Sequence, residues 1–296
     1  MENYPPTARA RVAEMIAAAE AEPNRAVAFQ GAPGAYSHQA VRELYDHAAA
    51  LPCFSFEDAI DSVEEGRAWC AVIPIENSLH GRVADIHFLL PESGLKIIAE
   101  HFVRVRHCLL ALPDAEKVGE VLSHPQALGQ CRKYLRARGI KPVAYPDTAA
   151  AAAEVVDQGN PGIGAIASAM AAELYGLKVL EEGIEDESHN TTRFVVLARE
   201  EQVPARGAAA MTSFIFEVKN VPAALYKALG GFATNGVNMT KLESYQRGAS
   251  FNATEFYADI EGLPDDPAVE RALEELRFHT KWVRLLGSYP QARPRN

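Results

Sequence analysis

The sequence predicts an α/β protein with two doubly wound lobes, a cleft between the lobes and a C-terminal βαββαβ unit. Short apolar runs rich in β-branched residues alternate with helix-forming stretches up to residue 198, which is typical of sheets covered by helices. After residue 207 the pattern changes to strands and two amphipathic helices in the order of a ferredoxin-like unit. A length of 296 residues agrees with roughly two domains.

The composition limits the class of partner. A formal net charge of -10 argues against nucleic acid and against an anionic membrane surface, because the field of the whole protein would repel both. An anionic substrate must therefore be held by a local positive site. No stretch is long and apolar enough to span a bilayer. The cysteines are scattered without metal-ligand spacing, so we expect reduced core thiols, no metal and a cytoplasmic protein.

Residues 1–24 precede the first predicted strand and are expected to form a helical extension. Between Thr7 and Ala21, alanines are interspersed with arginine and glutamate in an amphipathic helical pattern. A mitochondrial-type presequence would contain fewer acidic residues, so we interpret this segment as structural.

The first predicted strand, Ala26–Phe29, leads into a turn with two glycines and then a helix over Gln39–Tyr45. The first amides of a helix point outward unpaired, so this turn predicts an anion site near Tyr36 and Ser37. The glycines match neither a dinucleotide fingerprint nor a P-loop, which argues against nucleotide binding.

Polar residues follow the buried strand predicted over Cys70–Ile75. Glu76, Asn77 and Ser78 combine donors and an acceptor at the carboxyl end of this strand, where open α/β sheets bind ligands. The alternative is an ordinary polar turn. Ahead of this strand, Ser55 and the aspartate three residues later predict a capping box at a helix start.

The second lobe is expected to begin after the extended region Lys96–Leu112. A short strand ends at Ser123, and the helix opened by His124 and Gln126 predicts a second anion site at a helix start. A lone histidine such as His124 is more often structural than a base. Thr148 is predicted to cap the alanine-rich helix that follows.

The stretch Asn190–Phe194 enters a buried strand predicted over Val195–Ala198. Arg193 offers a planar fork of donors for a carboxylate, while Thr191 and Thr192 offer hydroxyls that donate and accept. The alternative is a capped strand with a surface arginine.

The last third of the chain follows the polar linker Arg199–Gly207. Such a linker predicts that the C-terminal unit folds separately, so we expect a chain ending near Ala205 to stay active. The predicted strands cover residues 214–218, 237–247, 256–260 and 282–286, and the predicted helices cover residues 225–232 and 266–276.

Four segments in one order connect this sequence to a known family. They are Gly31-x-Pro33-Gly34-x-Tyr36-Ser37-His38, Pro74-Ile75-Glu76-Asn77-Ser78, Ser123-His124-Pro125-Gln126-Ala127 and Asn190-x-Thr192-Arg193-Phe194. In these four segments and in their order, the sequence resembles the prephenate dehydratase family. The resemblance implies two lobes of the periplasmic-binding-protein type with the site in the cleft, a catalytic region over residues 25–203 with its second lobe about residues 107–186, and a homodimer or homotetramer. It also implies a monofunctional enzyme, because the segment ahead of the first strand is too short for a helical chorismate mutase.

The family resemblance also implies the site residues. The catalytic residues would be Thr192, Arg193 and Phe194. The residues that bind substrate would be Tyr36, Ser37, Glu76, Asn77, Ser78, Ser123, His124, Gln126, Thr148 and Thr191.

Residues 210–292 resemble ACT domains, which in this family bind phenylalanine for feedback inhibition. The family's Gly-Ala-Leu-Val element corresponds to Ala223-Ala224-Leu225-Tyr226, so an alanine replaces the glycine. Its Glu-Ser-Arg-Pro element corresponds to Glu243-Ser244-Tyr245-Gln246, of which the first two residues match. The turn at Asn238 is expected to complete the effector site.

The chemistry implied by the family is a loss of water and carbon dioxide from prephenate, which makes the ring aromatic and leaves phenylpyruvate. Thr192 suits the role of hydrogen-bond donor or relay to the departing hydroxyl, and no cofactor is needed. Arg193, or the amides near Ser37 and Ser123, would hold the remaining carboxylate. His124 or Glu76 is the expected proton source.

Two other functions stay open. Arogenate dehydratase would use the same site on the aminated substrate, and no residue separates the two substrates. A non-catalytic regulator that binds amino acids is the alternative from a different class, because lobed folds and ACT domains also serve binding alone.

Overall fold

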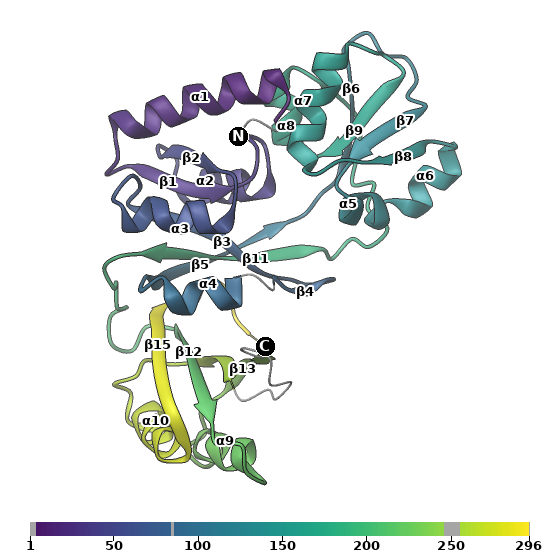
Figure 1. The fold of residues 1–296 in the computed structure, drawn as a ribbon. Helices are drawn as coiled ribbons and strands as arrows, with labels where there is room; N and C mark the ends of the chain where they lie inside the picture. Colours follow the sequence, from purple (N-terminus) through teal and green to yellow (C-terminus); the bar gives the residue numbers. More distant parts are fainter. Residues whose placement is uncertain (1–3, 84–85, 246–254, 296) are drawn as a thin grey trace. The chain divides into compact units, whose positions relative to one another are not determined.

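The computed structural model describes residues 4–83, 86–245 and 255–295 (Figure 1). Its helices in chain order are α1 (Pro6–Ala21), α2 (Tyr36–Leu44), α3 (Phe56–Glu64), α4 (Ile86–Glu92), α5 (Pro125–Gln130), α6 (Arg132–Arg138), α7 (Thr148–Gln158), α8 (Ala169–Tyr175), α9 (Ala224–Thr234) and α10 (Pro267–His279). Its strands are β1 (Ala26–Gln30), β2 (Ala49–Cys53), β3 (Cys70–Asn77), β4 (Gly81–Arg82), β5 (Lys96–Arg104), β6 (Cys108–Ala111), β7 (Glu120–Ser123), β8 (Lys141–Ala144), β9 (Ile163–Ala167), β10 (Lys178–Glu182), β11 (Thr191–Ala198), β12 (Ala210–Val218), β13 (Met239–Tyr245), β14 (Glu255–Glu261) and β15 (Thr280–Pro290).

The described strands form three sheets. The first has the order β2-β1-β3-β11-β5, with β4 paired to β3, and the second has the order β10-β6-β9-β7-β8. Both contain parallel pairs, such as β1 with β3 and β7 with β9, beside antiparallel pairs such as β6 with β9. Because helices alternate with these strands along the chain, the predicted α/β class is confirmed, with mixed sheets.

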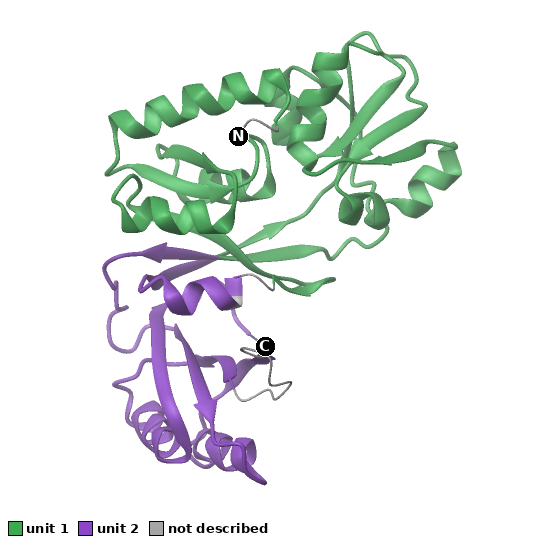
Figure 2. Cartoon of the chain, viewed as in Figure 1, with its two compact units in different colours: residues 1–83, 101–194 green, residues 84–100, 195–296 purple. Residues whose placement is uncertain are grey.

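The chain divides into two compact units (Figure 2). The first contains residues 1–83 and 101–194, and the second contains residues 84–100 and 195–296. The division therefore differs from the predicted ranges 25–203 and 210–292, because residues 84–100 contact the C-terminal strands. Arg284 donates to the carbonyl of Pro91, and a Cβ on Gly287 would lie 2.1 Å from the carbonyl oxygen of Ile97.

The glycine turn of the first unit is fixed by a close approach of two backbones. Gly34 has a φ of 94°, and a Cβ there would lie 2.8 Å from Cα of Ala171 in α8. Ser168 donates to the Gly34 carbonyl at 2.6 Å, and Tyr175 donates to the Pro33 carbonyl at 2.8 Å. The helix after this turn begins at Tyr36 rather than at the predicted Gln39.

Two other helix starts in the first unit test the sequence rules. The capping box at Ser55 is confirmed, since its hydroxyl accepts from the Asp58 amide at 3.0 Å and the reverse bond is also present. The predicted cap at Thr148 is wrong. Asp147 caps α7 by accepting from the Ala150 amide at 2.8 Å, which leaves Thr148 as the first helical residue.

Alanine lets helix α7 approach the second sheet closely. Its residues Ala149–Ala153 are buried and belong to one core cluster with Leu110 and Leu122. Helix α1 confirms the expected N-terminal helix, and its Thr7 binds Asp157 of α7 through both its amide and its hydroxyl. Among the described residues, no helix is long and apolar enough to cross a membrane.

The second unit contains the predicted βαββαβ order, which runs from β12 through α9, β13, β14 and α10 to β15. These strands form an antiparallel sheet in the order β13-β14-β12-β15, as in a ferredoxin-like unit. One face of the sheet is packed with aromatic rings, and Phe214 and Phe232 stack with their centroids 5.8 Å apart. The predicted βαββαβ order is confirmed.

Candidate functional site

Asn77 joins the ends of two neighbouring strands. Strands β3 and β11 are adjacent in the first sheet. The Asn77 amide nitrogen donates to the Thr192 hydroxyl at 3.0 Å and to Oδ1 of Asn190 at 2.8 Å. Its Oδ1 accepts from the backbone amides of Leu79 and His80 at 2.9 and 3.1 Å. One side chain thus fixes both the loop after β3 and the hydroxyl at the start of β11.

Asn190 begins the fourth family motif but is not among the predicted site residues. Its side chain is 1% exposed, and its Nδ2 has no hydrogen-bond partner within the part of the chain that the structure describes. An unpaired buried donor is unfavourable unless a ligand or water satisfies it. Its place beside Asn77 and Thr192 makes it a candidate site residue.

Ser78 holds the loop after β3 to the start of β11. Its hydroxyl donates to the carbonyl of His189 at 3.0 Å and accepts from the Thr191 amide at 2.9 Å. The Ser78 amide donates to the Thr191 carbonyl at 2.9 Å. Both of these hydrogen bonds of the Ser78 hydroxyl are therefore to backbone groups.

Arg193 is neither a surface arginine nor open to solvent. Its side chain is 3% exposed, and its Nη1 lies 3.0 Å from Oε1 of Glu76, whose side chain is 31% exposed. Phe194 is 1% exposed and belongs to the core. The guanidinium therefore binds a neighbouring carboxylate inside the protein, and the predicted direct hold on a substrate carboxylate is not what this geometry shows.

The residues near the start of α2 face the interior. The Tyr36 hydroxyl donates to the Arg106 carbonyl at 2.8 Å and lies 3.0 Å from Nδ1 of His107, while Ser37 is buried. Burial raises the pKa of Tyr36 well above its ordinary value of 10.0. Tyr36 is therefore a neutral hydrogen-bonding group that joins α2 to the strand β6 region.

Three predicted residues of the second lobe have structural roles. Ser123 is fully buried and donates to the Ile166 carbonyl at 2.6 Å, so its hydroxyl is committed to the sheet. His124 caps α5, because its Nδ1 accepts from the Gln126 amide at 3.3 Å. Thr148 begins α7 behind Asp147, whose pKa is raised by burial and partly lowered by backbone amides.

A cavity of about 540 Å³ lies beside the motif residues. Gln126 and Gln130 of α5 line it together with His80, Arg132 and Lys133, and the acidic segment 185–187 closes its edge. Sequence reasoning missed Gln130, although its spacing of four residues from Gln126 places both on one helix face. It also missed His80, which only the contacts of Asn77 bring to the site.

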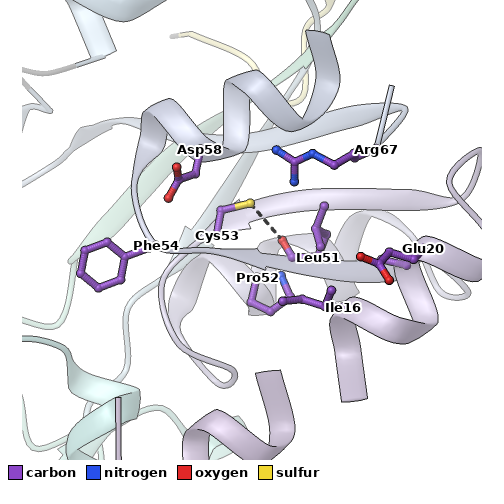
Figure 3. Close-up of a pocket in the computed structure, with 9 residues that line it drawn as sticks. Ile16, Glu20, Leu51, Pro52, Cys53, Phe54, Asp58 and Arg67 are labelled. Carbon is purple, nitrogen blue, oxygen red and sulfur yellow. Dashed lines mark hydrogen bonds between the residues drawn. The ribbon is translucent and has the colours of Figure 1, made fainter. Parts of the chain in front are cut away.

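A second cavity, of about 310 Å³, lies near α1 and is lined by Ile16, Cys53, Phe54, Asp58 and Arg67 among others (Figure 3). No predicted site residue lines it. Burial raises the pKa of the Cys53 thiol to about 11, and its sulfur donates to the Leu51 carbonyl. Within the described residues, no group of three His, Cys, Asp or Glu side chains is placed to hold a metal.

The predicted effector residues occupy both ends of the second unit. Ala223 caps α9 with a φ of 60°, and it is the only described residue other than glycine with a positive φ. In the sheet of this unit, Ser244 of β13 pairs with Phe256 of β14, which pairs with Phe216 of β12, near the start of α9. At the opposite end of the sheet, Met239 of β13 pairs with Ile260 of β14, which pairs with Thr212 of β12.

The remaining predicted effector residues also lie at one or the other of these two ends. Ala224 and Leu225 lie with Ala223 at the start of α9, and Glu243 binds Nζ of Lys241 at 3.1 Å. Asn238 donates to Glu261 at 3.0 Å beyond the other end of α9. An 11-residue helix is about 16 Å long, so one chain does not gather all these residues at one point. Gln246 lies outside the described residues.

Comparisons with known proteins agree with the fold. The model of the family "Prephenate dehydratase" matches residues 27–202. The chain is 49% identical over 272 residues to the bifunctional N-acyl-homoserine lactone acylase/prephenate dehydratase of Komagataeibacter europaeus, covering 90% of this chain and 96% of that protein. It is 39% identical to the chloroplastic arogenate dehydratase/prephenate dehydratase 1 of Arabidopsis thaliana, covering 89% of this chain and 71% of that protein.

A solved structure supports the same assignment. The crystal structure of prephenate dehydratase from Arthrobacter aurescens in complex with L-Phe has a TM-score of 0.82 and 30% identity, over 90% of each chain. The chain belongs to the prephenate dehydratase family.

Proposed function

We propose that this protein is a prephenate dehydratase that converts prephenate to phenylpyruvate in the biosynthesis of L-phenylalanine. The hydrogen bond from Asn77 to Thr192 is the observation that carries the proposal. Because the Thr192 oxygen accepts from the amide, its own proton is free to donate to another oxygen. The departing hydroxyl of the substrate is the acceptor that this chemistry requires.

The bond changes assign each group a task. The carbon–carbon bond to the leaving carboxylate breaks and its electron pair enters the ring, while the carbon–oxygen bond breaks and the departing oxygen takes up a proton from bulk solvent to become water. A threonine hydroxyl is too weak an acid to complete this alone, so Thr192 stabilises the departing oxygen as a hydrogen-bond donor. The buried Nδ2 of Asn190 is a second donor in the same place.

The structure changes the proposed roles of the charged residues. Arg193 binds Glu76 and thereby holds the ends of β3 and β11 together. Arg132 and Lys133 line the same cavity as Gln126, and they supply the local positive charge that a dianion requires in a protein of net charge -10. His124 caps a helix and Glu76 is the acceptor for Arg193, so neither is our proton donor.

A direct assay tests the proposal. Purified protein is mixed with prephenate or with arogenate, and phenylpyruvate or phenylalanine is measured. We expect turnover of prephenate. Turnover of arogenate alone would establish the second candidate, which the Arabidopsis relative and the acidic segment 185–187 beside the cavity favour, because these carboxylates could pair with an ammonium group.

The name of the Komagataeibacter relative also includes an acylase activity. Such chemistry requires an activated nucleophile. In this chain the hydroxyls of Ser78 and Ser123 both donate to backbone carbonyls, so we propose the dehydratase and include an acyl-homoserine lactone in the assay as a second substrate.

We further propose that the C-terminal unit is an ACT domain through which L-phenylalanine inhibits a homodimer or homotetramer. The ferredoxin-like sheet and the Arthrobacter relative in complex with L-Phe support this. The effector residues lie at two ends of the unit, so a complete site would combine ends from two subunits, and binding would favour one arrangement of the oligomer. Calorimetry with phenylalanine, tyrosine and tryptophan tests this, and the absence of any binding heat would refute it.

A further inference from the structure

A cavity of about 460 Å³ in the second unit takes no part in the function proposed above. Among the described residues, it is lined by Pro91 and Glu92 of α4, Ile215 of β12, and Trp282 and Arg284 of β15, none of which is a predicted effector residue. All of them belong to the second unit, which combines residues 84–100 with the C-terminal sheet (Figure 2). Cavities of several hundred cubic ångströms commonly hold small ligands, so this one is large enough for a small molecule.

The cavity lies on the face of the C-terminal sheet that is turned away from α9 and α10. Phe214 packs in the core with these two helices, and neighbouring side chains in a strand point to opposite faces, so Ile215 points to the other face. Ile215 pairs with Arg284 across β12 and β15, and Trp282 lies two residues before Arg284 in the same strand. These side chains therefore share the face opposite to the helices.

The indole of Trp282 is held in place by a carboxylate of the neighbouring strand. Its Nε1 donates to Oε2 of Glu217 at 2.8 Å, and Oε1 of Glu217 accepts from Lys281 at 2.6 Å. The Trp282 side chain is nevertheless 36% exposed. An indole that is fixed at its edge and open at its surface can stack with a second aromatic ring.

Arg284 supplies a positive charge in the same cavity. Its Nη1 donates to the carbonyl of Pro91. Among the described residues, no carboxylate pairs with this guanidinium. Its Nε and Nη2 present two parallel N–H groups, which is the arrangement that binds a carboxylate through both oxygens. Arg284 is therefore a candidate partner for the carboxylate of a ligand.

The remaining lining residues complete a site with three kinds of contact. Glu92 is an exposed carboxylate at the end of α4 and can pair with an ammonium group. Pro91 and Ile215 are buried and supply apolar surface. A cation, an anion and an aromatic surface in one cavity match a molecule that carries a carboxylate, an ammonium group and an aromatic ring.

We propose that this cavity binds an aromatic α-amino acid, with its carboxylate on Arg284, its ammonium group on Glu92 and its ring against Trp282. The inference does not depend on the proposed dehydratase activity. It also differs from the proposed effector site, because one chain supplies all the residues. An aromatic 2-oxo acid such as phenylpyruvate shares the carboxylate and the ring but has no group for Glu92.

Tryptophan fluorescence tests the site, because the chain has 2 tryptophans and the other one, Trp69, lies in the first unit. In Trp69→Phe protein, excitation at the red edge of the indole band reports Trp282 alone, since phenylalanine does not absorb there. We expect added phenylalanine to change this fluorescence saturably. The absence of a saturable change, with or without heat of binding, would overturn the proposal.

Variants of Arg284 test the contact with the carboxylate. We expect Arg284→Gln, whose amide can still donate to the Pro91 carbonyl, to weaken phenylalanine binding by at least about tenfold, and Arg284→Lys to weaken it less. Arg206→Gln is the matched control, since Arg206 is a surface arginine of the same unit that pairs with Asp265 at 3.8 Å. Unchanged affinity in Arg284→Gln would place the ligand elsewhere and refute the site.

A variant of Glu92 tests the class of ligand. We expect Glu92→Gln to weaken phenylalanine binding by about tenfold and to leave the weaker binding of phenylpyruvate, measured by calorimetry, unchanged. Phenylpyruvate that binds as tightly as phenylalanine, or unchanged phenylalanine binding in Glu92→Gln, would overturn the assignment to an amino acid.

These measurements stay separate from the other proposals. Binding as expected in a protein that dehydrates neither substrate would count against the proposed activity alone, whereas turnover of prephenate without the Trp282 signal would count against this site alone. Asn238→Ala changes the predicted effector set and should leave the Trp282 titration as it is. Loss of the titration in that variant would assign the signal to the effector site and refute the inference.

Discussion

The two compact units use their polar residues differently. In the first unit, side chains from distant segments converge, as Asn77 with Thr192 and His107 with Gln130 show. In the second unit, the predicted effector residues lie apart, with Ala223 and Asn238 beyond opposite ends of α9. Residues that converge within one chain form a site there, whereas residues that stay apart need a second surface to complete one. Under the proposed function, the catalytic site is complete within one chain, whereas the effector site requires a second one.

The largest effect on this comparison is expected from deleting the part of the second unit that follows the linker. From the linker alone we expected a chain ending near Ala205 to stay active. The contacts of residues 84–100 change that expectation, because the deletion would remove Arg295 from the buried carboxylate of Glu100 and expose Ile97. We now expect the shortened chain to lose cooperative unfolding and activity, as measured by thermal denaturation and the prephenate assay. A folded, active fragment would show that the linker, and not these contacts, sets the boundary.

A substitution at the catalytic hydroxyl should affect one unit alone. We expect Thr192→Ala to lower kcat by on the order of a hundredfold with less change in KM, because it removes a donor that matters most in the transition state. Thr192→Ser should retain much of the activity. Thr234→Ala is the control in the second unit, where the hydroxyl donates to carbonyls of its own helix and accepts from the adjacent Asn235 at 3.5 Å. Near-normal turnover of Thr192→Ala would remove the hydroxyl from the mechanism.

Acid should destabilise the first unit through its glycine turn. His38 accepts from the Gly34 amide at 3.1 Å and stacks on Phe29, and burial, with help from Arg42, lowers its pKa from 6.5 to about 4. The unfolded chain binds this proton below pH 6.5 and the folded chain resists it, so this stability is complete above pH 6.5 and is lost as the pH falls toward 4. The loss should be on the order of 2 kcal/mol.

Chemical denaturation between pH 7 and 4 measures that loss. His38→Asn should have a smaller dependence on pH over the same range. An unchanged dependence would assign the acid sensitivity to other groups.

The smallest expected effect concerns the strained start of α9. Ala223 has a φ of 60°, a conformation that an alanine adopts only at a cost. We expect Ala223→Gly to stabilise the protein by about 1 kcal/mol or less, because the relief of strain is partly offset by the greater freedom of glycine when unfolded. Denaturant unfolding measures this change. A destabilised variant would show that the Ala223 methyl group contributes contacts worth more than the strain.

Sequence patterns predicted helices and strands well where these depend on residues that are neighbours in sequence. The alternation around Phe214 and the capping box at Ser55 depend on neighbours in sequence, and both were predicted correctly. The start of α2 was placed at Gln39 instead of Tyr36, because the turn before it is held by Ala171 from a distant helix. The sequence pattern predicts Thr148 as a cap and the structure has Asp147; both side chains can accept, and only their backbone positions separate them.

The sequence motifs predicted which residues belong to the candidate site, but not which of these residues contact one another. The motifs named Asn77 and Thr192, and the structure joins them directly. They also suggested that Arg193 faces the substrate, since a sequence does not show that Glu76 from another strand lies within reach. His107 carried no signal of its own, because its side chain contacts Gln130 and Tyr36, which are distant in sequence.

The close approach of Gly287 to Ile97 also has a consequence for how this chain can be recombined. No side chain fits at position 287 while the backbone of residue 97 keeps its place, so the two positions must be compatible in any chimera. A graft that replaces only the residues after the linker would combine a foreign β15 with a native segment 84–100. A C-terminal unit exchanged between relatives should therefore be transferred as two pieces of sequence, one of which lies within the region that the family model covers.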